Sequence, residues 1–156
     1  MAIDTPPRPI VLYRHADEIR ELVAAFEART LAKERWSHQA HLTVGVAFLR
    51  RMARDAALDA LRDGILRYNE SVGTPNSDTR GYHETTTRFY VWSIEAYLGT
   101  RPPYLDILTA VNGLLVSPYG SKDFPFEFYS RERLLSVAAR RGWVEPDLKP
   151  LAADSV

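Results

Sequence analysis

Apolar residues recur at intervals of three and four through most of the chain, and this spacing restricts the fold more than any other feature of the sequence. Ala16, Ile19, Val23 and Phe26 show it first, and residues spaced in this way share one face of an α-helix. The same period continues over residues 38–52, 58–68, 83–97, 104–115 and 130–141. A short strand is conceivable only at residues 10–13, which have no obvious pairing partner. The pattern predicts an all-α bundle of five to six helices.

Cap and turn residues indicate where these helices begin and end. Ser37 and Ser130 are suitable N-caps, because a serine hydroxyl can accept from the free N–H groups of a first turn. The helix that carries His83 should begin near residue 81, after a loop rich in Gly, Pro and Asn. The next helix should begin at residues 101–103, where Pro follows Pro, and Gly142 should end the last one.

Length and composition favour one domain over residues 1–156. A chain of this length buries a core without covalent staples, and it contains no cysteine that could supply a disulfide or a thiolate ligand. Pro6, Pro7 and Pro9 predict an extended lead over residues 1–13. Pro146 and Pro150 predict a tail over residues 143–156 that lies on the surface.

The charge balance argues against nucleic acid and membranes as partners. Twenty Lys and Arg residues offset twenty Asp and Glu residues, so no net field attracts the chain to a polyanion. No apolar run approaches the roughly 20 residues that span a bilayer. Residues 1–9 lack the apolar core of a signal peptide. We therefore expect a cytoplasmic protein whose partner is a small-molecule substrate.

The histidines are the strongest functional signal. His38 and His41 are three residues apart after the Ser37 cap, so both imidazoles lie in one first helical turn. The positive end of the helix dipole there disfavours imidazolium and keeps both rings neutral and able to ligate. Gly45, one turn further along, leaves room for a ligand. His15 is expected at the surface or as a cap of the first helix.

His83 completes a candidate metal site. It opens another helix on the apolar stripe, and Glu84 follows it directly. We expect His38, His41 and His83 to bind one divalent metal ion, with Glu84 as a fourth ligand or a general base. Zinc, copper, iron and nickel all suit such a set. Two alternatives stay open: a metal-free pocket in which the rings bond to backbone carbonyls, and a structural metal that clamps two helices.

Further residues are candidates for catalysis or for the walls of the pocket. Arg88 could clamp a carboxylate or pair with Glu84 four residues earlier, and Tyr82 joins these two as a catalytic candidate. The expected pocket residues are Trp36, Thr87, Tyr90, Tyr119 and Lys122. The aromatic segment 117–129 should cover the cavity as a lid, and the alternative is that it forms a homodimer interface.

Several of these motifs occur together in a known group of proteins. The chain resembles small bacterial proteins of uncharacterised function, and the resemblance covers residues 36–148. It is carried by Trp36-Ser37-His38-Gln39-Ala40-His41-Leu42, by Tyr68-Asn69, by Gly81-Tyr82-His83-Glu84-Thr85-Thr86-Thr87, and by matching residues between Tyr129 and Leu148. This resemblance implies motif positions and no reaction.

Two functions follow as hypotheses. The first is a metal-dependent enzyme that acts on a small polar substrate, with oxidoreductase, hydrolase and lyase chemistry all open. The second is a non-catalytic helical domain that binds a small molecule or a partner in a polar, histidine-lined pocket. Metal content distinguishes them, because only the first requires a bound ion.

Overall fold

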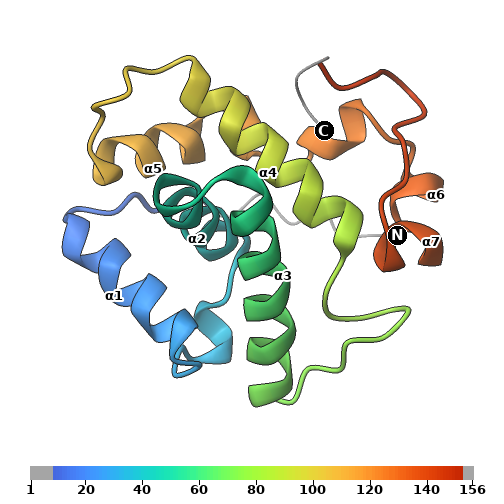
Figure 1. Cartoon of the computed structure of the whole chain (residues 1–156), viewed down its shortest axis with the longest axis horizontal. Coiled ribbons are helices and arrows are strands. Elements are labelled where there is room, and N and C mark those ends of the chain that lie inside the picture. Colours follow the sequence, from blue (N-terminus) through green and yellow to red (C-terminus); the bar gives the residue numbers. More distant parts are fainter. Residues whose placement is uncertain (1–8, 153–156) are drawn as a thin grey trace.

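The computed structural model describes residues 9–152, and within them the all-α prediction is confirmed (Figure 1). Five helices have ten or more residues. They are α1 (Ala16–Glu27), α2 (His38–Arg51), α3 (Arg54–Ser71), α4 (Glu84–Gly99) and α5 (Ile107–Val116). Two short helices follow, α6 (Arg131–Leu134) and α7 (Val137–Arg141), with 3-10 turns η1 (Lys33–Arg35), η2 (Pro118–Gly120) and η3 (Phe124–Glu127). No strand occurs in this part of the chain.

Capping explains why some helix boundaries were predicted correctly and others were not. The Ser37 hydroxyl accepts from the backbone N–H of Ala40 at 3.2 Å, so α2 begins at His38 as predicted. The fifth helix begins later than predicted, because the Asp106 carboxylate caps it through Thr109 N–H at 2.9 Å. The last helix is divided in two, since the hydroxyl of Ser136 caps a new start.

Helix α2 forms the centre of the fold. It contacts α1, α3, α4 and α5, and its residues from Leu42 to Phe48 are all buried. Gly45 allows α4 to approach closely, because a Cβ atom at this position would lie 2.6 Å from Cδ1 of Ile94. A helix with four helical neighbours buries most of its surface. His38 and His41 in its first turn lie on the side that faces α3 and α4.

A second cluster of buried rings covers the other side of α4. Phe89 is fully buried among Trp92, Phe128 and Tyr129, with ring centroids 5.4 to 6.3 Å from its own. The segment 117–129 supplies part of this cluster and also contacts α5 through η2. This packing holds the segment against the helical body.

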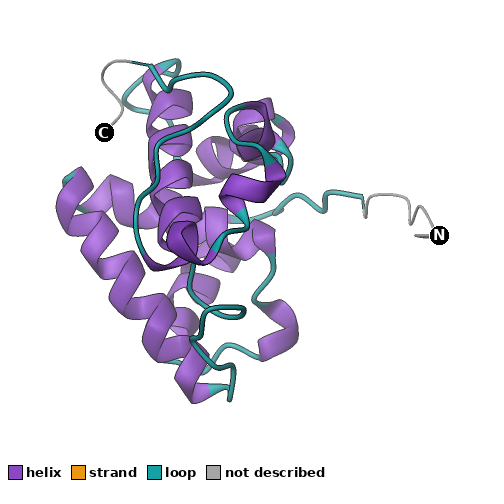
Figure 2. Cartoon of the chain, turned by 90° about the vertical axis from the view of Figure 1, so that its right-hand side faces the viewer, coloured by secondary structure: helices purple, strands orange, loops and turns teal. Residues whose placement is uncertain are grey.

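Both described ends of the chain lack helix and strand (Figure 2). Specific hydrogen bonds attach them to the helical body. The backbone N–H of Tyr13 donates to Oδ1 of Asn112 at 3.0 Å, and Nδ2 of Asn112 donates to the Tyr13 carbonyl at 2.9 Å. Val144 N–H donates to the Thr85 hydroxyl at 3.1 Å. The predicted lead and tail thus agree over residues 9–13 and 143–152, and the remainder of each prediction lies outside the described residues. No helix in the described chain is long and apolar enough to cross a membrane.

Candidate functional site

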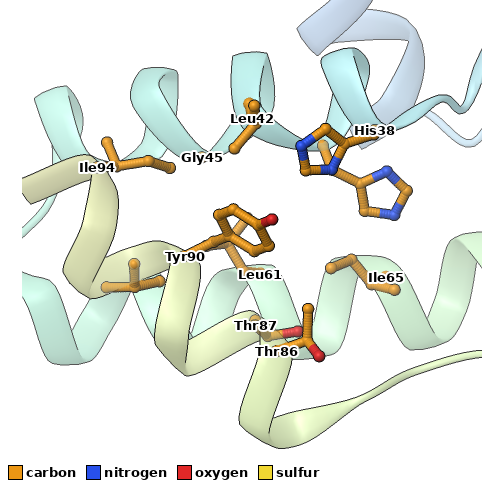
Figure 3. A pocket seen from close by; sticks show the side chains of 11 residues that line it. His38, Leu42, Gly45, Leu61, Ile65, Thr86, Thr87, Tyr90 and Ile94 are labelled. Carbon is orange, nitrogen blue, oxygen red and sulfur yellow. The ribbon is translucent and has the colours of Figure 1, made fainter. Parts of the chain in front are cut away.

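A two-chambered cavity lies between α2, α3 and α4, beside the first turns of α2 and α4. The apolar chamber has a volume of about 300 Å³ (Figure 3) and is lined by His38, His41, Leu42, Gly45, Leu61, Ile65, Thr86, Thr87, Tyr90, Val91 and Ile94. The polar chamber has a volume of about 350 Å³ and is lined by Lys33, Trp36, His41, Ile65, Tyr68, Asn69, Val72, Thr74, Arg80, Gly81, Tyr82, His83, Thr86 and Thr87. The two chambers share four wall residues and therefore adjoin. Volumes of this size suit small organic ligands.

His41 stands at the junction of the chambers. Its Nδ1 lies 2.7 Å from the Ser37 carbonyl oxygen, and since a carbonyl only accepts, Nδ1 carries the proton and Nε2 is an acceptor. Within the described chain, each side-chain nitrogen or oxygen that is fully enclosed by protein has a hydrogen-bond partner. Nε2 of His41 has no such partner, so this atom is not fully enclosed and borders the open space of the cavity. The ring stacks on Trp36 with centroids 3.8 Å apart, and Trp36 stacks on Phe26 at 4.5 Å.

Burial keeps His41 neutral. Loss of solvation lowers the pKa of the imidazole to about 4, and the hydrogen bond to Ser37 opposes this only in part. A low dielectric disfavours the charged ring more than one neutral acceptor stabilises it. At neutral pH the group offered to the cavity is therefore a neutral, oriented acceptor. This agrees with the neutral rings expected from the sequence.

His38 has a matching arrangement in the apolar chamber. Its Nε2 donates to the Gly120 carbonyl at 2.9 Å, which leaves Nδ1 as an acceptor. The ring meets the edge of Tyr90 with centroids 5.2 Å apart. Burial lowers its pKa, and the charge of Lys122 lowers it further, while the bond to Gly120 acts in the opposite direction. The rings of His38 and His41 thus each have one nitrogen fixed by a carbonyl and one available.

His83 is used differently from the prediction. It precedes α4 as the N-cap, and its Nδ1 accepts from the Thr86 N–H at 3.1 Å. Its Nε2 donates to the Leu134 carbonyl at 2.9 Å. Both nitrogens are already bonded in this arrangement, so the ring joins the start of α4 to α6 and borders the polar chamber with its remaining surface.

Glu84 is engaged by an arginine that sequence reasoning did not single out. Its two carboxylate oxygens accept from Nε and Nη2 of Arg62 at 2.7 and 2.8 Å, and the Tyr82 hydroxyl donates to it at 2.7 Å. Burial would raise the pKa of Glu84, but these hydrogen bonds lower it below its ordinary value. Arg88 instead lies over the Trp143 ring, 4.8 Å from its centroid. The sequence offered no local signal for Arg62, because it lies 22 residues from Glu84.

The structure therefore brings together only part of the predicted site. His38, His41, Thr87 and Tyr90 share the apolar chamber, and Trp36, Tyr82 and His83 border the polar one. Glu84, Arg88, Tyr119 and Lys122 line neither chamber. Within residues 9–152, no three His, Asp or Glu side chains are grouped closely enough to hold one metal ion.

The segment 117–129 holds side chains of the cavity wall in place from outside the cavity. The carbonyl of Gly120 fixes His38, and the carbonyl of Ser121 accepts from the Tyr90 hydroxyl at 2.7 Å. The Tyr119 carbonyl accepts from Ser93 at 2.7 Å, and its ring packs against Tyr97 and Phe124. No residue of the segment 117–129 lines a chamber. The segment instead orients two wall side chains, those of His38 and Tyr90, through its main-chain carbonyls.

Several wall residues were not anticipated, namely Lys33, Asn69, Arg80 and Thr86. Asn69 is buried near the end of α3, and its amide donates to Oδ1 of Asn76 at 3.0 Å. Lys33 and Arg80 are exposed charges in a turn and a loop, where sequence patterns carry little information.

The resemblance to a bacterial family stays a prediction. Comparisons of the chain with family models, with curated proteins and with solved structures found no match.

Proposed function

We propose that this protein binds a small molecule in the two-chambered cavity, with His41 Nε2 accepting a hydrogen bond from it. The observation that supports this most directly is that His41 lines both chambers and has a ring nitrogen with no partner in residues 9–152. A neutral ring held by a carbonyl and by a stacked tryptophan costs little further ordering when a ligand arrives. This favours the non-catalytic alternative of the two hypotheses from the sequence.

The chemistry of the junction fits a ligand with a hydroxyl or another donor near its middle or head. The Thr86 hydroxyl borders both chambers and has no hydrogen-bond partner in the described chain, so it can donate or accept. The Thr87 hydroxyl donates to the His83 carbonyl at 2.8 Å and also interacts with the Tyr82 side chain, so it is less available to a ligand than Thr86. An imidazole with a pKa near 4 is a weak base at neutral pH, so binding is a better supported role than proton abstraction.

The proposal predicts that 1-octanol binds and that His41→Phe weakens its binding about five- to tenfold, the effect of one lost hydrogen bond. Phenylalanine retains the stack on Trp36 and removes both ring nitrogens. The measurement is titration followed by ¹⁵N NMR of the imidazole nitrogens, in which the Nε2 resonance of His41 should shift with octanol.

The exposed His15 provides the matched control. Its nitrogens should not shift in the same titration, and His15→Phe should leave the octanol affinity unchanged. If octanol at saturating concentration leaves the His41 Nε2 resonance in place, the proposal is wrong.

A second candidate function is supported by the free nitrogens of His38 and His41. Histidines that bind metals usually donate their other N–H to a carbonyl or carboxylate, and both rings do this with Gly120 and Ser37. We propose as this alternative a metal-dependent enzyme in which the two rings hold one divalent ion and a polar substrate completes its coordination. Zinc, copper, iron and nickel remain equivalent choices for two imidazoles.

This alternative predicts about one equivalent of transition metal in protein purified without a histidine tag. The measurement is elemental analysis before and after dialysis with zinc chloride. His41→Phe should abolish retention of the ion, and His83→Gln should leave it unchanged, because both nitrogens of His83 are bonded within the fold. A metal-free protein that also fails to retain added zinc, copper, iron or nickel excludes this second function.

A further inference from the structure

Two cationic side chains border the polar chamber, and no acidic side chain does. Lys33 comes from the turn η1, and Arg80 comes from the loop between α3 and α4. The ion pairs within residues 9–152 all join other residues. Two positive charges that face one concave surface without a counter-ion create a positive potential there.

Two of the three neighbouring carboxylates are paired with other residues. Glu84, behind Tyr82, is paired with Arg62. Asp78, two residues before Arg80, is bonded through both oxygens to Arg141 at 2.7 Å. Glu34 is exposed beside Lys33 and does not line the chamber, although its charge acts on the Tyr68 hydroxyl in the chamber wall. The wall itself contains two cationic side chains and no carboxylate.

The adjoining apolar chamber has no Lys, Arg, Asp or Glu side chain in its wall. Beyond the histidines, threonines and Tyr90, its walls are Leu42, Gly45, Leu61, Ile65, Val91 and Ile94. Figure 3 shows Gly45 and Ile94 at one end of this chamber and His38 and Ile65 toward the other. A surface of this kind stabilises an apolar chain by removing it from water.

From this polarity we infer that the ligand is an amphiphilic acid. Its anionic head lies between Lys33 and Arg80 in the polar chamber. A hydroxyl or another donor along its chain meets His41 Nε2 and Thr86 at the junction, and the apolar remainder of the chain ends near Gly45. This inference rests on the proposed binding function and adds the ligand class. A carboxylate is the head best matched to one ammonium and one guanidinium group, because both donate to its oxygens.

Gly45 limits the length of the chain that fits. A Cβ atom there would lie 2.6 Å from Cδ1 of Ile94, so an alanine displaces the end of Ile94 at the far end of the chamber. The added methyl group takes space only where a long chain would reach. Short acids do not extend to this position.

The test compares three probes of equal chain length, octanoate, 1-octanol and octylamine, by calorimetric titration near neutral pH. We expect octanoate to bind about tenfold more tightly than octanol, and octylamine to bind most weakly. The double variant Lys33→Met/Arg80→Met should reduce octanoate binding to the level of octanol. Arg20→Met/Lys149→Met also removes two positive charges, which belong to exposed pairs elsewhere, and should leave the preference intact.

A chain-length series supplies a second, independent measurement. Gly45→Ala should weaken octanoate binding several-fold and leave butanoate binding unchanged. Equal affinity of the wild-type protein for octanoate and octanol, or a preference for octanoate that survives Lys33→Met/Arg80→Met, overturns the ligand class while the binding function stands. If none of the probes binds and the His41 nitrogens do not respond, the binding function itself fails.

Discussion

Replacing Glu84 with alanine should lower the free energy of unfolding by about 3 kcal/mol, as expected when one partner of a buried ion pair is removed. The Glu84 side chain is only 10% exposed, and it holds both the Arg62 guanidinium and the Tyr82 hydroxyl. Without it, the Tyr82 hydroxyl loses its acceptor and the half-buried guanidinium loses its counter-charge. Arg62 also contacts Asp59 at 2.9 Å, which limits the loss.

Chemical denaturation monitored by circular dichroism measures this change. Asp63→Ala is the matched control, because the Asp63–Arg67 pair is more than half exposed and exposed pairs contribute less than about 1 kcal/mol. The double variant Glu84→Leu/Arg62→Leu should recover part of the stability, since it leaves no charge unpaired.

The same experiment decides what Glu84 does. A catalytic carboxylate or a metal ligand held ready for a substrate is commonly a strained group, and its removal leaves stability unchanged or improves it. A loss below about 1 kcal/mol for Glu84→Ala would contradict the structural role described here and would restore Glu84 as a candidate for catalysis.

Acidification should destabilise the protein between about pH 6.5 and pH 4, before most carboxylates titrate. The pKa of His41 is lowered from 6.5 to about 4, so in this range the unfolded chain binds a proton that the native protein does not. Stability therefore falls as pH falls through this window. The difference between the two pKa values corresponds to about 3 kcal/mol. His38 and His83, whose pKa values burial also lowers, act in the same direction.

The unfolding free energy measured at intervals of pH tests this, and His41→Phe should remove most of the slope. Carboxylates contribute to a lower window: the pKa values of Glu84 and Asp106 lie below 4.5 and 3.8, so their stabilising effect is lost only at more acidic pH. A wild-type stability that is flat from pH 6.5 to pH 4.5 would contradict the burial of neutral histidines.

The parts of the site that the sequence predicted are those set by local chemistry. Ser37 as a cap places His38 and His41 in one first turn, and the period of α2 then directs both rings inward. These relations involve residues within four positions, where helix geometry fixes direction. The sequence therefore anticipated the part of the cavity wall that the first turn of α2 supplies.

The parts that it missed depend on contacts between distant segments. An i+4 spacing suggested Arg88 as the partner of Glu84, but the packing of α3 against α4 brings Arg62 to it. Similarly, a histidine at the start of a helix resembles one in its first turn. Only the position of the Leu134 carbonyl makes His83 a cap that is bonded on both sides. Tertiary packing decides which of these partners is used, and the spacing of apolar residues along the chain carries no information about it.

The way in which the start of α4 is held has a consequence for the order of events during synthesis. His83 is bonded to the Leu134 carbonyl, Thr85 to the Gly142 carbonyl, and the Gly81 carbonyl to Arg140. Each contact joins residues more than 50 positions apart, and such contacts form late because the intervening loop must close first. On the ribosome, α1, α2 and α3 emerge well before residues 134–142. The cavity wall at Thr86 and Thr87 therefore acquires its final support only after the helices opposite it have been made, so a nascent chain is helical before its cavity is complete.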